Sequence, residues 1–166
     1  MKIAVMADSH ENMPKIARAI EIFNEEEVDL LCHCGDVISP ICAREFAKLE
    51  APFVAVFGNN DGERYYLREK FKDIGSFHEE PHHFEVAGIN IQLMHRPINI
   101  DALLAEGRDD YVFYGHTHAI DVRDEGKPII VNPGEAGGWL SGRCTAAIVD
   151  TKGREKPVRI IDLDQD

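Results

Sequence analysis

Short hydrophobic runs in this chain are repeatedly followed by polar side chains that can bind metal ions. Runs of this length are typical of buried β-strands. In an open α/β sheet the carboxyl ends of the strands share one edge, so residues distant in sequence can meet there. The side chains that follow five such runs are Asp8 and His10 after Ile3–Ala7, Asp36 after Leu30–Cys34, Asn59 after Val54–Phe57, His95 after Ile91–Met94, and His116 and His118 after Val112–Tyr114. Carboxylates, an amide and imidazoles in this arrangement predict a site for two divalent cations.

Length and composition predict one compact domain over residues 1–166. The chain has 166 residues, of which 44% are hydrophobic, enough for a core of its own. There is no apolar stretch of about 18 residues or more, and no leader precedes the first run, so we expect neither a membrane span nor secretion but a cytoplasmic protein. The four cysteines form no CxxC pair, and we expect reduced thiols in the core.

The formal net charge of −12 argues against a broad nucleic-acid surface, because phosphate backbones are bound mainly by clustered lysine and arginine. A small anionic substrate is still compatible with this charge. Two divalent ions would bring four positive charges against the two negative charges of Asp8 and Asp36. The sequence is also compatible with a homo-oligomer.

Strand and helix patterns alternate in the first half of the chain. Helices are expected after Asn12 and Pro14, after Ser39 and Pro40, and after a capping Asp61. The expected strands are Lys2–Ala7, Val28–Cys34 and Pro52–Phe57, and the inner faces of the second and third helices are Cys42, Phe46 and Leu49, and Leu67, Phe71 and Ile74. This alternation predicts a mainly parallel sheet covered by helices.

The second half is rich in strands. Ala87 and Gly88 predict a hairpin, and a short helix is expected over Ile100–Ala105. The expected strands are Phe84–Val86, Ile89–Met94, Tyr111–Tyr114, Ile120–Arg123, Pro128–Val131, Thr145–Asp150 and Pro157–Asp162, with Asp162–Asp166 as a solvated tail. The predicted fold class is α/β, with two packed mixed β-sheets flanked by helices in an αββα sandwich.

Taken in order, the motifs resemble those of the calcineurin-like metallophosphoesterase superfamily, and in particular its compact archaeal and bacterial phosphodiesterase branch. The resemblance spans nearly the whole chain. It rests on Asp8-Ser9-His10, Gly35-Asp36, Gly58-Asn59-Asn60-Asp61, His95 and Gly115-His116-Thr117-His118, with Asn132-Pro133-Gly134 as a further element. Each motif alone is weak, but five in the right order are specific. The fold of this family is a two-sheet sandwich with outer helices, which agrees with the fold predicted above.

The resemblance also implies a ligand set and a reaction. It assigns the first ion to Asp8, His10 and His118, the second ion to Asn59, His95 and His116, and the bridging position to Asp36. It implies a metal-dependent phosphoric ester hydrolase, a phosphodiesterase that cleaves a small soluble ester by in-line attack of a hydroxide bridging the two ions. The imidazole-rich set favours Mn²⁺, Fe, Co²⁺, Ni²⁺ or Zn²⁺ over Mg²⁺ or Ca²⁺, and we favour Mn²⁺.

Asn60 departs from the family pattern. Many members carry a histidine there that protonates the leaving group, whereas an amide has no proton to give at neutral pH. We therefore expect a preference for esters whose leaving group is already acidic, such as a phenol with a pKa of about 10. The compact branch also lacks this histidine, which favours a diesterase over a monoesterase.

Arg96 and Pro97 form a second departure, because relatives usually have glycine after the histidine that corresponds to His95. Two interpretations of Arg96 stay open. It can bind a substrate phosphate as a charged fork, or it can point to solvent or pair with an acidic loop. The catalytic candidates are therefore Asp36, Asn59, Asn60 and Arg96.

Other histidines have simpler interpretations. His33 lies within an apolar run and is expected to be a structural core residue. His78, His82 and His83 are expected in an exposed connection. Trp139 fits the core, the lip of a substrate cleft or an oligomer contact equally well.

Two alternatives to the phosphodiesterase remain. One is a phosphomonoesterase or nucleotide pyrophosphatase of the same fold. The other is a non-catalytic protein-interaction scaffold, like the retromer subunit that resembles these enzymes but has eroded ligands. The chain is too short for a cap domain over the cleft, so its sequence says little about the group attached to phosphorus.

Overall fold

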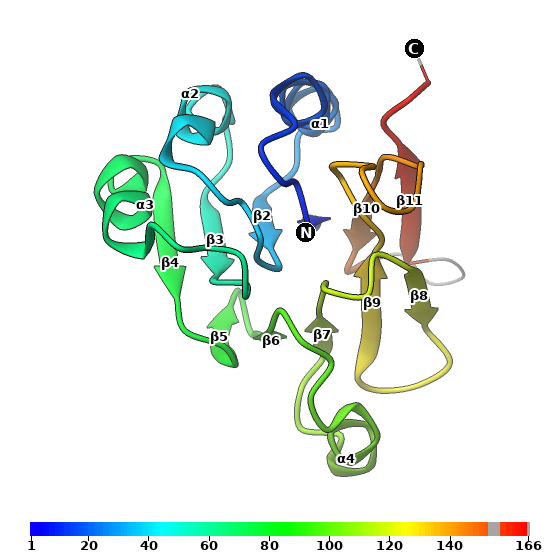
Figure 1. The fold of residues 1–166 in the computed structure, drawn as a ribbon. Helices are drawn as coiled ribbons and strands as arrows, with labels where there is room; N and C mark the ends of the chain where they lie inside the picture. The colour runs from blue at the N-terminus through cyan, green and yellow to red at the C-terminus, as the bar shows by residue number, and fades with distance from the viewer. Residues whose placement is uncertain (153–156, 166) are drawn as a thin grey trace.

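The computed structural model of the protein describes residues 1–152 and 157–165, and within them two β-sheets lie face to face (Figure 1). The first sheet has the order β11-β10-β1-β2-β3-β4 and the second the order β5-β6-β7-β9-β8. The strands of the first sheet are β1 (Lys2–Met6), β2 (Leu30–His33), β3 (Phe53–Val56), β4 (Gly75–His78), β10 (Thr145–Asp150) and β11 (Val158–Asp162). Those of the second are β5 (His82–Val86), β6 (Ile89–Leu93), β7 (Tyr111–Phe113), β8 (Ile120–Arg123) and β9 (Ile129–Pro133).

Helices connect the parallel strands of the first sheet. Strands β1 to β4 run parallel, and β10 and β11 extend the sheet in antiparallel pairs. Parallel neighbours need a crossover connection, which the helical segments provide. These are α1 (Met13–Glu25), a 3₁₀ turn (Pro40–Cys42) followed by α2 (Ala43–Phe46), and α3 (Arg64–Phe71). Helix α1 begins as predicted, because the Asn12 side chain accepts a hydrogen bond from the Lys15 amide and Pro14 lies in the first turn.

The second sheet contains the predicted hairpin. Ala87 and Gly88 both have positive φ, at 51° and 78°, between the paired residues Val86 and Ile89. This is the backbone conformation that a two-residue hairpin turn requires. Strands β6, β7 and β9 are parallel, β8 is antiparallel to β9, and the outer face carries α4 (Ile100–Glu106).

Three apolar clusters fill the spaces between the layers. One lies between the two sheets and includes Val5, Cys32 and Phe113. Another lies between the first sheet and helices α1 to α3, and a smaller one lies beneath α4. The order of layers is helix, sheet, sheet, helix, as Figure 1 shows, with α4 alone on the far side. The predicted αββα sandwich is confirmed.

Strand β4 was not predicted from the sequence. Helix α3 ends at Phe71, so Ile74 lies outside it, and Gly75–His78 pairs with β3. Only Phe77 is buried in this strand, which leaves almost no hydrophobic pattern to detect. His78 and His82 therefore lie on β4 and β5, not in an exposed connection, and their rings stack with centroids 3.6 Å apart.

Two smaller expectations were also wrong. The second helix ends at Phe46, so Leu49 lies in the turn after it. The predicted solvated tail, Asp162–Asp166, begins too early in the sequence. Leu163 is only 2% exposed and packs into the core under α1. Asp166 lies outside the described residues. Among the helices that the structure describes, none is long and apolar enough to cross a membrane.

Candidate metal centre

All seven predicted metal ligands lie in loops at the carboxyl ends of strands. These loops follow β1, β2 and β3 in the first sheet and β6 and β7 in the second, so both sheets contribute to one site. The candidate ligand atoms form two neighbouring clusters that meet at Asp36. The structure therefore brings together Asp8, His10, Asp36, Asn59, His95, His116 and His118.

The first cluster surrounds the carboxylate of Asp8. Its Oδ1 atom lies 3.5 Å from His118 Nε2 and 3.8 Å from His10 Nε2. Asp8 Oδ1 and His10 Nε2 are both buried, and neither has a hydrogen-bond partner among the described residues. The Asp8 carboxylate, opposed by burial, also raises the pKa of His10, and Asp36 adds to the rise. Buried polar atoms without partners are costly, and a cation between them would satisfy both.

The second cluster surrounds His95, which is fully buried. Its Nδ1 atom lies 2.9 Å from the Cys34 carbonyl oxygen, which only accepts, so Nδ1 carries the proton. The lone pair of His95 is thus on Nε2. That atom lies 2.8 Å from Asn59 Oδ1, 3.1 Å from His116 Nδ1 and 3.6 Å from Asp36 Oδ2. Electron-pair donors that face one another at these distances fit a cation held between them.

Asp36 connects the two clusters. Its Oδ2 atom lies 3.7 Å from His10 Nε2 in the first cluster and 3.6 Å from His95 Nε2 in the second. The carboxylate is 1% exposed and accepts hydrogen bonds from Asn60, at 2.8 Å from the backbone N–H and 2.7 Å from Nδ2. Asp36 is thus held between the two clusters by its hydrogen bonds to Asn60.

The backbone of the ligand loops is strained. Asp8, His10, Asp36, His116 and His118 all have φ between 42° and 67°, in the left-handed region. Aspartate and histidine tolerate this region better than most residues, but its cost persists only where the surrounding structure enforces it. Such residues gather at functional sites.

Glycines allow the loops to approach closely. A Cβ on Gly58 would lie 2.1 Å from Asp36 Oδ1, and one on Gly35 would lie 2.8 Å from His95 Nδ1. Gly35 also has a φ of 93°. A side chain at either position would push the clusters apart.

Asp61 does not cap α3, so the predicted helix cap was wrong. Helix α3 begins at Arg64, and the carboxylate of Asp61 is 3% exposed and turned toward the site. It accepts hydrogen bonds from the backbone N–H groups of Asp36 at 3.0 Å, Ile38 at 2.7 Å and Gly58 at 2.7 Å. Burial raises the pKa of Asp61, and these N–H donors oppose the rise. Asp61 thereby joins the Asp36 loop to the Asn59 loop.

Glu135 is a site residue that the sequence analysis missed. It is fully buried, and its Oε2 atom lies 3.3 Å from His118 Nδ1, although the two groups are not aligned for a hydrogen bond. Burial opposes its charge, but hydrogen bonds from Ser141 and Leu140 hold the pKa of Glu135 below its usual range. A carboxylate beside the second ring nitrogen is a common neighbour of a metal-binding histidine. The only local signal was its place directly after Asn132-Pro133-Gly134.

Asn132 supports the histidine loop from its place in β9. It is fully buried, and its Nδ2 atom donates to the Gly115 carbonyl at 3.0 Å and to Thr117 Oγ1 at 2.9 Å. These bonds hold the segment between His116 and His118.

Arg96 pairs with an acidic residue, one of the interpretations left open above. Its Nε atom lies 2.7 Å from Glu80 Oε1. Glu80 Oε2 also accepts the backbone N–H groups of His95 and Arg96, both at 2.8 Å. Burial raises the pKa of Glu80, but these hydrogen bonds outweigh it and lower the pKa. Glu80 thereby fixes the loop that carries His95.

His33 lies beneath the site and is fully buried, as expected of a structural core residue. Burial lowers its pKa to about 3, so the ring is neutral. Its Nδ1 atom accepts the Gly35 N–H at 3.2 Å, and Nε2 lies 3.1 Å from Ser9 Oγ. His33 thus supports the loops of Asp8 and Asp36 from below.

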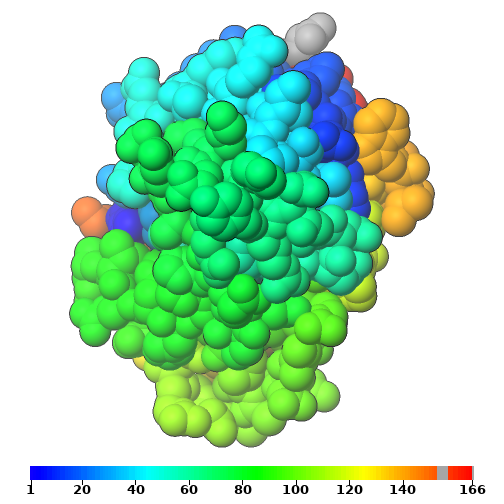
Figure 2. Space-filling model, turned by 60° about the vertical axis from the view of Figure 1, so that its left-hand side comes forward, coloured from blue at the N-terminus to red at the C-terminus, as the bar shows by residue number. Residues whose placement is uncertain are grey.

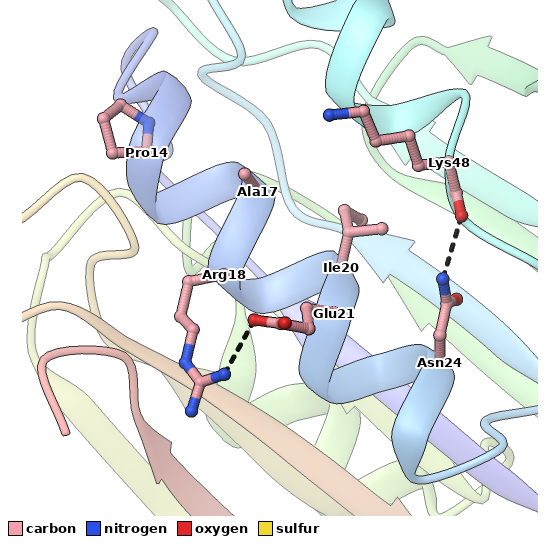
Figure 3. Close-up of a pocket in the computed structure, with 7 residues that line it drawn as sticks. All are labelled: Pro14, Ala17, Arg18, Ile20, Glu21, Asn24 and Lys48. Carbon is pink, nitrogen blue, oxygen red and sulfur yellow. Dashed lines mark hydrogen bonds and ion pairs between the residues drawn. The ribbon is translucent and has the colours of Figure 1, made fainter. Parts of the chain in front are cut away.

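Two of the hollows on the surface differ in the residues that line them. The hollow over the centre is about 480 Å³ and is lined by Asp36, Asn59, Asn60, His116, Thr117, His118, Leu140 and Ser141. The other, the α1 hollow, lies between α1 and the turn after α2 and contains none of the predicted ligands (Figure 3). There Arg18 pairs with Glu21, and Asn24 donates to the Lys48 carbonyl. The polar groups that line the α1 hollow thus bond to one another.

Comparison with known proteins identifies the family. Residues 1–154 match the calcineurin-like phosphoesterase superfamily domain. A phosphodiesterase from Methanocaldococcus jannaschii is 38% identical over 159 residues, which cover 93% of this chain and 96% of that protein. The solved structure of a novel archaeal phosphodiesterase superposes with a TM-score of 0.89 at 37% identity, over 98% of this chain and 99% of that one.

The chain therefore belongs to the calcineurin-like phosphoesterase superfamily. It is a phosphoesterase, and membership implies divalent metal ions as cofactors. The family and the class of enzyme predicted from the sequence are confirmed. A zinc complex of Vps29 from Entamoeba histolytica superposes with a TM-score of 0.67 over 98% of this chain and 99% of that one, but at 15% identity, which is a likeness of fold alone.

Proposed function

We propose that the protein is a dinuclear metal-dependent phosphodiesterase that hydrolyses a small phosphate ester in the cytoplasm. The observation that carries this proposal is the pair of ligand clusters around Asp36, with Asp8 Oδ1 and His10 Nε2 buried and without partners in the described chain. The phosphodiesterase from M. jannaschii and the archaeal phosphodiesterase structure support the choice of a diester. The four buried, unpaired cysteines suit a reducing compartment.

Each cluster is suited to hold one cation. Asp8, His10 and His118 would hold the first, and Asn59, His95 and His116 the second, with Asp36 shared. When bound, two divalent ions would supply a water of lowered pKa and would offset the negative charge of the phosphoryl group. Neutral imidazoles and an amide leave that positive charge largely uncompensated, and they favour Mn²⁺ or a later transition metal.

Residues around the clusters would hold the ligands in place. Asp61 ties the Asp36 loop to the Asn59 loop, Glu135 orients His118, and the Glu80–Arg96 pair fixes the His95 loop. We propose this positioning role for Arg96 in place of a contact with substrate. Ligands held by such outer contacts are already ordered before substrate binds, so less entropy is lost on binding.

Asn60 would favour substrates with good leaving groups. Its side chain is exposed to the hollow over the centre and donates to Asp36 Oδ2. An amide can orient and polarise a substrate group by hydrogen bonding, but it does not protonate a departing alkoxide. Aryl phosphodiesters, which release a stabilised phenolate, are therefore the preferred class of substrate.

The fold alone does not separate an enzyme from a protein-interaction scaffold of the same architecture. The intact ligand set favours the enzyme, since a protein-binding scaffold does not need seven converging metal ligands. The phosphomonoesterase and nucleotide pyrophosphatase alternatives use the same chemistry and differ in substrate.

Turnover of bis(p-nitrophenyl) phosphate and p-nitrophenyl phosphate tests this choice. We expect kcat/KM to be about tenfold or more higher for the diester, and because both substrates release p-nitrophenolate, this ratio reports the class of ester and not the leaving group. Activity should disappear on chelation and return with Mn²⁺ or Ni²⁺. A clear monoester preference would overturn the diesterase assignment, and inactivity with every metal would favour the scaffold.

A further inference from the structure

A second hollow opens beside the one that lies over the metal centre. It is about 520 Å³, a size that accommodates a small organic group. Its lining residues are His10, Glu11, Ile38, Asn60, Glu135, Trp139 and Leu140. Asn60 and Leu140 line both hollows, so the two adjoin each other. A group attached to a phosphoryl unit in the first hollow would extend into the second.

Large apolar side chains form the wall of this second hollow. Trp139 is 66% exposed and Leu140 is 79% exposed, although both residues are of types that usually lose most of their exposure on folding. They lie in the loop between β9 and β10, whose orange surface projects beside the blue N-terminal segment in Figure 2. An exposed apolar wall that adjoins a reaction centre is typical of a ligand-binding surface.

This loop is held in place from within. The buried carboxylate of Glu135 accepts the backbone N–H groups of Trp139 at 2.7 Å, Leu140 at 3.1 Å and Ser141 at 2.8 Å. The Trp139 indole donates from Nε1 to the His10 carbonyl at 3.1 Å, which fixes one edge of the ring. The indole is therefore ordered before any ligand arrives, which lowers the entropic cost of binding.

The charges around the second hollow limit what it can bind. Its lining, as described by the structure, contains no lysine or arginine, and Glu11 is exposed at its rim. A second phosphate or a carboxylate would be repelled there. The Glu135 carboxylate is already occupied by backbone N–H groups. The hollow thus favours an uncharged group, for which Trp139, Leu140 and Ile38 offer apolar contacts.

We propose that the hollow beside Trp139 is a subsite for a planar, uncharged aromatic group, such as a nucleobase, esterified to the phosphoryl group at the metal centre. This inference rests on the proposed function and specifies its substrate class. The indole supplies a stacking surface, as exposed aromatic side chains do for bases in other proteins. Ile38 and Leu140 supply the apolar edges.

Fluorescence of Trp139 tests the subsite without turnover, because it is the only tryptophan of the chain. Thymidine monophosphate should quench its emission saturably in the Mn²⁺-loaded protein, whereas methyl phosphate should not. Leu140→Ala should raise the Kd for thymidine monophosphate about fivefold, because part of the apolar wall is lost. Tyr65→Ala is the matched control, since it removes another exposed aromatic ring on α3, 70% exposed, and should leave the Kd unchanged.

A pair of esters with the same leaving group tests the subsite in catalysis. Thymidine p-nitrophenyl phosphate should have a higher kcat/KM than methyl p-nitrophenyl phosphate. Trp139→Ala should lower that ratio about tenfold, and Trp139→Phe should restore most of it, because a stacking ring is present again. A ratio unchanged in Trp139→Ala would overturn the proposal.

The two experiments separate this inference from the proposed function. If neither ester is cleaved with any metal but thymidine monophosphate quenches saturably, the phosphodiesterase fails and the aromatic subsite stands. If both esters are cleaved at equal rates and no quenching occurs, the subsite fails and the phosphodiesterase stands. Emission that shifts with protein concentration, and not with ligand, would make the loop a contact between copies and would also overturn the proposal.

Discussion

Replacing Asp36 with alanine is expected to lower kcat/KM for bis(p-nitrophenyl) phosphate by about 10³-fold or more, because the loss of one cation of a pair removes several kcal/mol of charge stabilisation. Bound Mn²⁺ should fall from two ions per chain to one or fewer. The Asp36 carboxylate lies within 4 Å of His10 in the first cluster and of His95 in the second. Elemental analysis and steady-state kinetics on the same preparation measure both effects.

Asp73→Ala is the matched control for this substitution. Asp73 is exposed in the turn after α3 and lines neither the hollow over the metal centre nor the hollow beside Trp139. It should keep two ions and full activity. Thermal unfolding should show that both variants are folded. An Asp36→Ala protein that retains two ions and normal turnover would show that Asp36 does not bridge.

Replacing Asn60 with histidine is expected to weaken the dependence of the rate on the leaving group. In a series of aryl methyl phosphates, turnover of the wild-type protein should fall steeply as the pKa of the phenol rises. An imidazole at this position can protonate the leaving oxygen, so the unsubstituted phenyl ester should gain about 10²-fold and the p-nitrophenyl ester much less. The slope of log kcat against the pKa of the phenol measures the change.

Asn60→Ala separates proton donation from the other effects of this substitution. It also removes the 2.7 Å hydrogen bond from Asn60 Nδ2 to Asp36 Oδ2, but it adds no acid. Its rates should fall across the series while the slope stays steep. If Asn60→His has the wild-type slope, protonation at this position does not limit the reaction, and the explanation of substrate preference from Asn60 is wrong.

The fold was largely predictable from sequence because its inner strands are continuously apolar. Strands such as β2 and β10 are buried along nearly their whole length, and such runs bounded by polar loops are strong local signals. Strand β4 gave no such signal, since only Phe77 faces the core. Leu163 was missed because a single apolar residue near the end of the chain has no periodicity.

The convergence of the candidate ligand residues could be predicted because each follows a strand, whereas the residues that hold their loops in place could not. Asp61 bonds to the N–H groups of Asp36 and Ile38, more than twenty residues earlier. Glu80 bonds to the His95 loop, and Glu135 lies behind His118. A carboxylate in a loop gives the same local pattern whether it is solvated or buried. Only the tertiary fold distinguishes the two cases.

The decisive measurement is anomalous diffraction from crystals of the Mn²⁺-loaded protein. We predict two peaks about 3.5–4 Å apart, the usual separation in two-metal sites. One should lie among Asp8, His10 and His118, the other among Asn59, His95 and His116, with the Asp36 carboxylate in contact with both. A single peak, or imidazoles turned away from an empty pocket, would contradict the dinuclear centre on which the proposed reaction depends.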